Sequence, residues 1–187
     1  FSVIPCNADK TPAITSWAKL QKTPLSREDV EGLFCKGTRL GIICGKVSRN
    51  VECLDFDDPS VFDPFIEMLS LKDPDLPRQL VKRKTPSGGN HIIYRSEKAV
   101  GGNQKFAMSE NGKKVRIESR GEGGYFITCP SPGYEVVEHS LLECPTLNTS
   151  EIELLHTTAK MFDLRPVAET NNSHTYLKNN INSPGTN

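Results

Sequence analysis

The chain has 187 residues, 36% of them hydrophobic and 25% charged, and its 23 basic side chains balance 23 acidic ones. A chain of this length and composition indicates one ordinary soluble domain, since it can bury roughly 70% of its unfolded surface. The neutral total excludes a uniformly basic nucleic-acid coat protein, and no apolar run approaches the roughly 20 residues that span a bilayer, so no membrane contact is expected.

The first third of the chain is predicted to hold two helices followed by two strands. Apolar residues at helical spacing favour a helix over 13–20. Ser26 and Asp29 have the spacing of a capping box, which predicts that a second helix begins there. Apolar runs bounded by a polar turn predict strands over 40–44 and 51–56.

The middle of the chain is predicted to contain one helix and then mostly strands. Asp58 can cap a helix and Pro59 suits the first helical position, so this helix is expected to run to about residue 71. Further strands are predicted over 76–84, 91–94, 114–118 and 125–128. The alternation of these elements predicts a mixed α/β fold.

The end of the chain divides into a last helix and a polar tail. Periodic apolar residues predict a helix over 150–162 that closes the domain. Beyond it the sequence is rich in Asn, Ser and Thr, which cannot form a core, so we expect a folded domain over 1–167 and a flexible linker or tail over 168–187. Because residue 1 is Phe, we expect the chain to be a fragment of a longer protein.

The six cysteines point to a reducing compartment. They lack the close spacing of a zinc knuckle, so no structural zinc is expected. Several stand inside apolar runs, as buried free thiols do, and such thiols are typical of the cytoplasm.

The first candidate site is an acid pair at the end of a predicted strand. Asp55 and Asp57 point the same way because strand side chains alternate, so their carboxylates can converge on a divalent cation. A calcium loop is excluded, since Ser60 and Ile66 stand where it needs Gly and Glu. Two alternatives stay open: Asp57 and Asp58 merely cap the next helix, or the pair belongs to a sugar transferase.

The second candidate site is a glycine turn that follows a basic run. Gly88 and Gly89 let backbone N–H groups face an anion, and Ser87 and His91 can donate hydrogen bonds to phosphate oxygens. The basic residues that precede the turn are Lys82, Arg83 and Lys84. This pattern favours a triphosphate cradle, although an ordinary hairpin turn with a solvated charge run stays open.

The third candidate site is a strand of alternating charge. Arg116, Glu118 and Arg120 share one face if the alternation holds. Glu118 could be a third metal carboxylate, and Arg120 a partner for phosphate or for that acid. An exposed strand face of mixed charge is the alternative. Taken in order, an acid pair, a turn ending in His and another acid suit nucleotidyl transfer, in which two divalent ions activate the attacking hydroxyl and stabilise the leaving pyrophosphate.

These segments together resemble a known family. Residues 50–57, 85–91 and 118–125, with Lys10 and Trp17 ahead of them, are similar to the bifunctional primase-polymerase domain of the archaeo-eukaryotic primase superfamily. The resemblance spans roughly 1–143 and keeps the family's motif order. It implies an RRM-like catalytic sheet packed with a second small α/β unit, with the active site in the cleft between them.

The resemblance also implies an activity and a set of site residues. The activity is that of a DNA primase and polymerase, a nucleotidyltransferase that makes and extends primers from NTPs or dNTPs on single-stranded DNA. Asp55, Asp57 and Glu118 would hold two Mg²⁺ or Mn²⁺ ions, although the family often has Asp in place of Glu118. The residues expected to bind the nucleotide are Ser87, Gly88, Gly89, His91 and Arg120.

The resemblance bears on partners as well. Family members occur in mobile elements and CRISPR-associated loci, often fused to a helicase or to other domains. Template contact is expected to be electrostatic. The candidate residues are Lys82, Arg83, Lys84, Lys113, Lys114 and Arg116. Two further hypotheses remain: a catalytically inactive nucleic-acid-binding module of the same fold, and a metal-dependent phosphoesterase.

Overall fold

The computed structural model describes residues 1–34 and 38–166, which contain two sheets and four α-helices. The strands are β1 (Ser2–Cys6), β2 (Arg39–Ile43), β3 (Val51–Phe56), β4 (Val81–Lys84), β5 (Asn90–Ser96), β6 (Gln104–Met108), β7 (Val115–Arg120), β8 (Tyr125–Thr128), β9 (Glu135–Glu138) and β10 (Thr146–Leu147). The α-helices are α1 (Arg27–Leu33), α2 (Phe62–Lys72), α3 (Leu76–Gln79) and α4 (Thr149–Lys160). The 3-10 turns are η1 (Ala18–Gln21), η2 (Lys46–Ser48), η3 (Pro59–Val61) and η4 (Leu141–Glu143).

The strands form one small and one large sheet. The small sheet has the order β1-β2-β8 and is antiparallel. The large sheet has the order β6-β7-β3-β5-β4-β9, antiparallel along this path, and β10 pairs with β5 in parallel. Strand β3 therefore lies inside the large sheet, between β7 and β5. The predicted mixed α/β class is confirmed.

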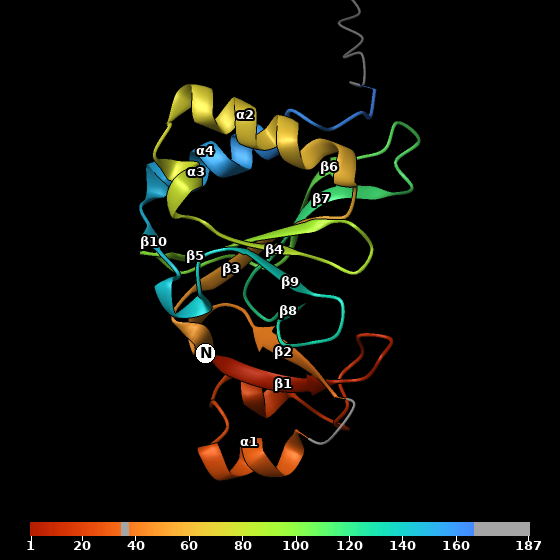
Figure 1. Ribbon diagram of the computed structural model, residues 1–187, viewed down its shortest axis with the longest axis vertical. Coiled ribbons are helices and arrows are strands. Elements are labelled where there is room, and N and C mark those ends of the chain that lie inside the picture. Colours follow the sequence, from red (N-terminus) through yellow and green to blue (C-terminus); the bar gives the residue numbers. More distant parts are fainter. Residues whose placement is uncertain (35–37, 167–187) are drawn as a thin grey trace, which may run out of the picture.

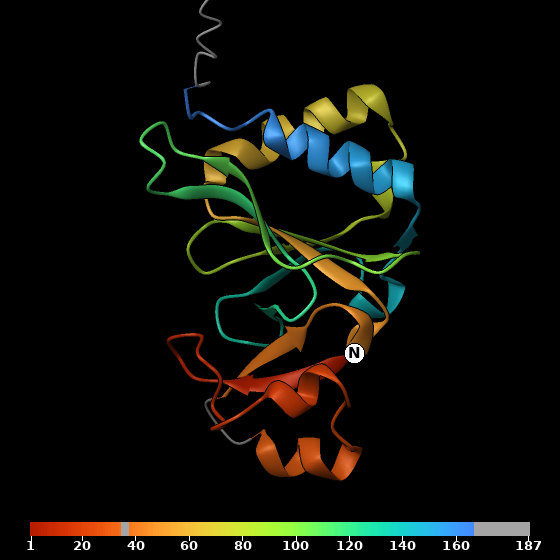
Figure 2. The same cartoon turned by 180° about the vertical axis from the view of Figure 1, so that it is seen from behind.

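The large sheet is the middle layer of the molecule. Helices α2 and α4 cover one of its faces, and the small sheet, with α1 beyond it, lies on the other side (Figure 1). The view from behind shows α4 beside α2 over the same face (Figure 2). Side chains of β3 alternate between these layers: Leu54 and Phe56 enter the core beneath the helices, whereas Val51 and Cys53 enter a core with Phe126 of the small sheet.

Two helix-start signals predicted from the sequence, at Ser26 and at Asp58, are confirmed by the structure. Ser26 and Asp29 form the predicted capping box of α1, with each side chain accepting from the other residue's backbone N–H. The Asp58 carboxylate accepts from the N–H of Ser60, and Pro59 opens the turn η3 that leads into α2. These caps satisfy N–H groups that a helix start leaves without partners.

Two predicted elements are wrong in part. The helix expected over 13–20 is reduced to η1, because the N–H of Ala13 donates to the Pro5 carbonyl (2.8 Å) and binds the start of the segment to β1. The strand expected over 76–84 begins only at β4. Its first half forms α3, where the Asp73 carboxylate accepts from the N–H of Leu76 (3.1 Å).

Four strands were not predicted: β1, β6, β9 and β10. Every residue of β9 is exposed, so its sequence carries no alternation that would reveal a buried face. The predicted tail over 168–187 lies outside the described residues. Within residues 1–34 and 38–166, no helix is long and apolar enough to cross a membrane.

Candidate active site

Three carboxylates meet where β3 and β7 run side by side. Asp55 in β3 pairs in register with Glu118 in β7, and Asp57 follows directly after β3. One ligand oxygen from each of the three lies within 4.8 Å of the others. Carboxylate oxygens at this spacing are the donors that hard divalent cations prefer, so the donor set fits Mg²⁺ or Mn²⁺.

The charge of the acid cluster is only partly neutralised by its protein neighbours. Arg120 contacts Asp55 (Nη2 to Oδ2, 3.4 Å) and forms a closer ion pair with Glu118, while the Nε2 of His91 lies 3.4 Å from Asp55 Oδ1. Burial raises the pKa of Asp55, but the hydrogen bonds and charges of His91 and Arg120 outweigh it, so the pKa is lowered. Asp55 is therefore held as a carboxylate.

The other two acids have raised pKa values, chiefly because they are buried. Burial and the charge of Asp55 raise the pKa of Asp57, with opposing contributions from Arg120 and Lys10. Burial also raises the pKa of Glu118, against the effect of the neighbouring Arg120. Raised pKa values mean that the ionised forms are disfavoured as the site stands, and a bound divalent cation would relieve this.

The glycine turn after β4 is shaped by contact with the end of β3. Gly88 has a φ of +88°, which favours glycine, and its N–H donates to the carbonyl of Thr85 (3.0 Å). A Cβ on Gly89 would lie 2.3 Å from the carbonyl oxygen of Phe56. The Gly88 N–H that we expected to face an anion is thus used inside the turn, and the two glycines let the turn approach Asp57.

Beside this turn, His91 is a buried side chain with one ring nitrogen left over. It pairs in register with Asp55, is 4% exposed, and its ring lies edge-on to Phe126 with centroids 5.7 Å apart. Its Nδ1 has no hydrogen-bond partner among the described residues. Buried polar atoms are rarely left in this state, so an ordered water is the expected partner of this nitrogen.

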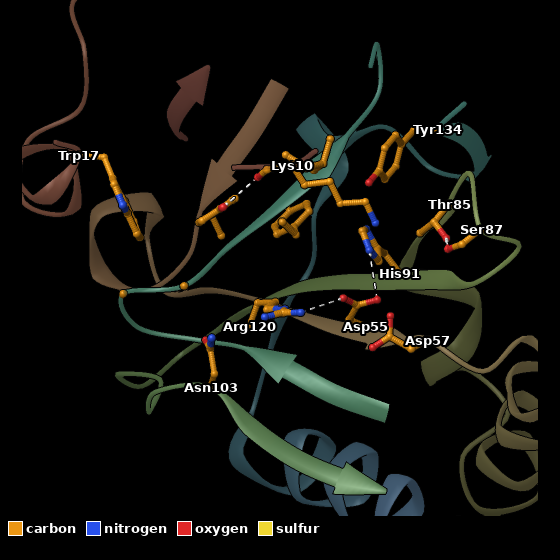
Figure 3. A pocket seen from close by; sticks show the side chains of 15 residues that line it. Lys10, Trp17, Asp55, Asp57, Thr85, Ser87, His91, Asn103, Arg120 and Tyr134 are labelled. Carbon is orange, nitrogen blue, oxygen red and sulfur yellow. Dashed lines mark hydrogen bonds and ion pairs between the residues drawn. The ribbon is translucent and has the colours of Figure 1, made fainter. Parts of the chain in front are cut away.

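Asp55, Asp57 and His91 line one pocket of about 340 Å³ between the large sheet and the first part of the chain (Figure 3). Ser87, whose hydroxyl lies 3.1 Å from that of Thr85, is at its edge. The residues that line the pocket are Lys10, Trp17, Asp55, Asp57, Thr85, Ser87, His91, Asn103, Arg120, Gly123, Gly124, Tyr125, Phe126, Ile127 and Tyr134. Glu118 stands beside it through its contacts with Arg120 and the two aspartates.

Several lining residues received no role from the sequence. Lys10, Trp17 and Tyr125 were noted only as part of the resemblance, and Asn103 and Tyr134 not at all. Trp17 packs edge-on against Tyr125, with ring centroids 5.3 Å apart. These residues come from loops and from the small sheet, and no local pattern in the sequence indicates that they face the acid pair.

The basic residues expected to contact a template have different surroundings. Lys82 and Arg83 are buried: the Lys82 ammonium pairs with Glu138 (2.5 Å), and the Arg83 guanidinium donates to the Glu138 carbonyl (3.0 Å). Arg116 forms its ion pair with Asp58 (2.9 Å) and not with Glu118 of its own strand. These three brace the fold. The exposed members of the set are Lys84, Lys113 and Lys114.

Comparison with known protein families gives one clear match. The model of the family described as bifunctional DNA primase/polymerase, N-terminal, matches residues 1–149. This range includes every residue of the pocket and of the acid cluster. No curated protein matches the chain significantly.

Proposed function

The chain belongs to the bifunctional DNA primase/polymerase family, and we propose that it is a DNA primase and polymerase that makes and extends primers from nucleoside triphosphates on single-stranded DNA. The observation that carries this proposal is the convergence of Asp55, Asp57 and Glu118 beside Ser87 and His91. Nucleotidyl transfer needs metal-binding acids and a phosphate site together. The active site is accordingly proposed to be the pocket between the sheets, and the catalytic unit to lie within residues 1–167.

In this proposal the three acids hold two divalent ions, Mg²⁺ or Mn²⁺. Bound there, such ions lower the pKa of an attacking hydroxyl and stabilise charge on a leaving pyrophosphate. Arg120 keeps Asp55 and Glu118 in place by bridging them, since it contacts both. Of the three acids, Asp55 is the one whose pKa is lowered, by His91 and Arg120 against the effect of burial, which suits a permanent ligand.

The residues of the turn hold the substrate's phosphates. The hydroxyl of Ser87 provides a hydrogen-bonding group on the side of the pocket next to the acids, and His91 lines the pocket beside it. The oxygen of the primer's terminal hydroxyl forms the new bond to the α-phosphorus, and the bond from that phosphorus to the β-phosphate oxygen breaks. Pyrophosphate leaves, and the hydroxyl proton passes to solvent. Aligning these groups is the main task of the protein.

Template binding is proposed to depend on charge. Lys84, Lys113 and Lys114 are exposed on the strands and turns that surround the glycine turn and β7, so their ammonium groups are available to a phosphate backbone. Lys82, Arg83 and Arg116 are left out of this proposal because each is engaged by an acidic residue or a carbonyl of the protein.

The direct test is primer synthesis on single-stranded DNA with nucleoside triphosphates and Mn²⁺. We expect Asp55→Ala/Asp57→Ala to lower the rate by at least about 10³-fold, because metal stabilisation of the transition state amounts to several kcal/mol. The control is Glu28→Ala/Glu31→Ala, which removes two exposed acids from α1. Parent-like activity of the first variant would refute the proposal. Pyrophosphate release at a rate that does not depend on added template would favour a phosphoesterase.

A further inference from the structure

Lys10 stands at the tip of a loop that the protein holds firmly. The loop follows β1 and is closed by backbone hydrogen bonds, from Asn7 N–H to the Thr11 carbonyl (2.8 Å) and from Lys10 N–H to the Asn7 carbonyl (3.0 Å). The hydroxyl of Tyr125 in β8 donates to the carbonyl of Lys10 (2.9 Å). The position of this residue is therefore set from both sides, by its own loop and by the small sheet.

The backbone at this position favours a residue other than lysine. Lys10 has a φ of +71°, in the left-handed region where glycine and asparagine are at ease and a long side chain is disfavoured. The hydrogen bonds that hold residue 10 in the loop involve its backbone N–H and carbonyl. The loop can thus form without a lysine side chain, and an unfavourable residue kept in a firm loop indicates a functional use.

The side chain of Lys10 extends across the pocket, with its ammonium toward His91 and the Asp55 carboxylate (Figure 3). Among the described residues the ammonium forms no hydrogen bond or ion pair, although its charge reaches Asp57. Arg120, the other strong cation of the pocket, is already engaged by Asp55 and Glu118. Lys10 is thus available to an anion that enters the pocket.

We propose that Lys10 binds the triphosphate of the incoming nucleotide together with the glycine turn, which makes the N-terminal loop part of the nucleotide site. The inference rests on the proposed function. A phosphate that contacts Ser87 and His91 would also meet the Lys10 ammonium, which lies toward His91 (Figure 3), and lysine is well suited to phosphate as a compact charge on a flexible stem. Trp17, which also lines the pocket, follows this loop in the chain.

The test compares metal-dependent affinity for deoxyguanosine triphosphate with Mn²⁺, measured by calorimetry in the absence of DNA. We expect Lys10→Gly to weaken binding about tenfold, the usual effect of losing a hydrogen bond to a charged group. Its melting temperature should be unchanged or higher, because glycine relieves the left-handed backbone. Lys10→Arg should restore most of the affinity.

Arg49→Gly is the matched control, because Arg49 is also exposed, cationic and left-handed, with a φ of 60°, and does not line the pocket. Unchanged affinity in Lys10→Gly, or an equal loss in Arg49→Gly, would overturn the inference. So would a Lys10→Gly variant that binds single-stranded DNA more weakly but nucleotide as before. A parent that binds no triphosphate would refute the inference and the proposed function together, whereas the first three outcomes leave primer synthesis by the parent intact.

Discussion

Strand β3 carries an acidic side chain to each face of the large sheet, and the two acids have opposite surroundings. Glu52 lies beneath α4, is 3% exposed, and has its Oε1 3.5 Å from the Nε2 of His156. The hydroxyl of Tyr94 is hydrogen-bonded to the same nitrogen (3.1 Å). Asp55 faces the pocket instead, where two further acids stand beside it. Burial of a carboxylate does not by itself indicate a functional site.

What distinguishes the two faces is the balance of partners. On the helix-covered face the Glu52 carboxylate contacts the His156 imidazole and the Tyr94 hydroxyl, and these three groups form a small buried network. On the pocket face three carboxylates share Arg120 and His91, and the pKa values of Asp57 and Glu118 are raised. On the pocket face the ionised forms of two acids are disfavoured, whereas on the helix-covered face the carboxylate is engaged by its neighbours.

The larger expected effect on stability is on the helix-covered face. Glu52→Leu keeps the size of the side chain but takes one partner from His156 and Tyr94, so we expect the free energy of unfolding to fall by about 1–3 kcal/mol. Urea denaturation measures this, and metal-dependent nucleotide affinity of the folded variant should stay at the parent level. A stable variant with lost nucleotide binding would reverse the assignment of the two faces.

A smaller effect of opposite sign is expected on the pocket face. Burial raises the pKa of Glu118 above its ordinary 4.5, so its ionised form costs stability at neutral pH. Without divalent ions, Glu118→Gln should therefore be slightly more stable than the parent at pH 7. Because both folded and unfolded forms are protonated below pH 4.5, the gain should vanish there. Denaturation at the two pH values, with chelator present, would contradict this if the variant were less stable at pH 7.

The parts of the fold that were predicted correctly depend on short-range signals. The capping residues Ser26 and Asp58 each act on N–H groups within three positions, so the sequence contains the whole interaction. The helix predicted over 13–20 is wrong because the start of that segment is hydrogen-bonded to β1, and the spacing of apolar residues gives no information on this contact. Strand β9 was not predicted because it is exposed throughout and forms by pairing with β4.

The candidate site shows the same division. Alternation along the strand predicted that Asp55 and Asp57 point the same way, and their oxygens do converge, but the pairing of Asp55 with both His91 and Glu118 follows from strand order, which no pattern revealed. The ion pair between Lys82 and Glu138 likewise depends on the pairing of β9 with β4. Lys10 lies far from the acids in sequence, and only the folded loop brings it to the pocket.

The most direct measurement of the central claim is a crystal structure of the protein with Mn²⁺ and a non-hydrolysable nucleoside triphosphate, with anomalous scattering used to locate the metal. We expect manganese between the carboxylates of Asp55, Asp57 and Glu118, and phosphate oxygens near His91. Nucleotide bound in the pocket with no manganese at these three acids, or manganese at Glu52 instead, would contradict the account.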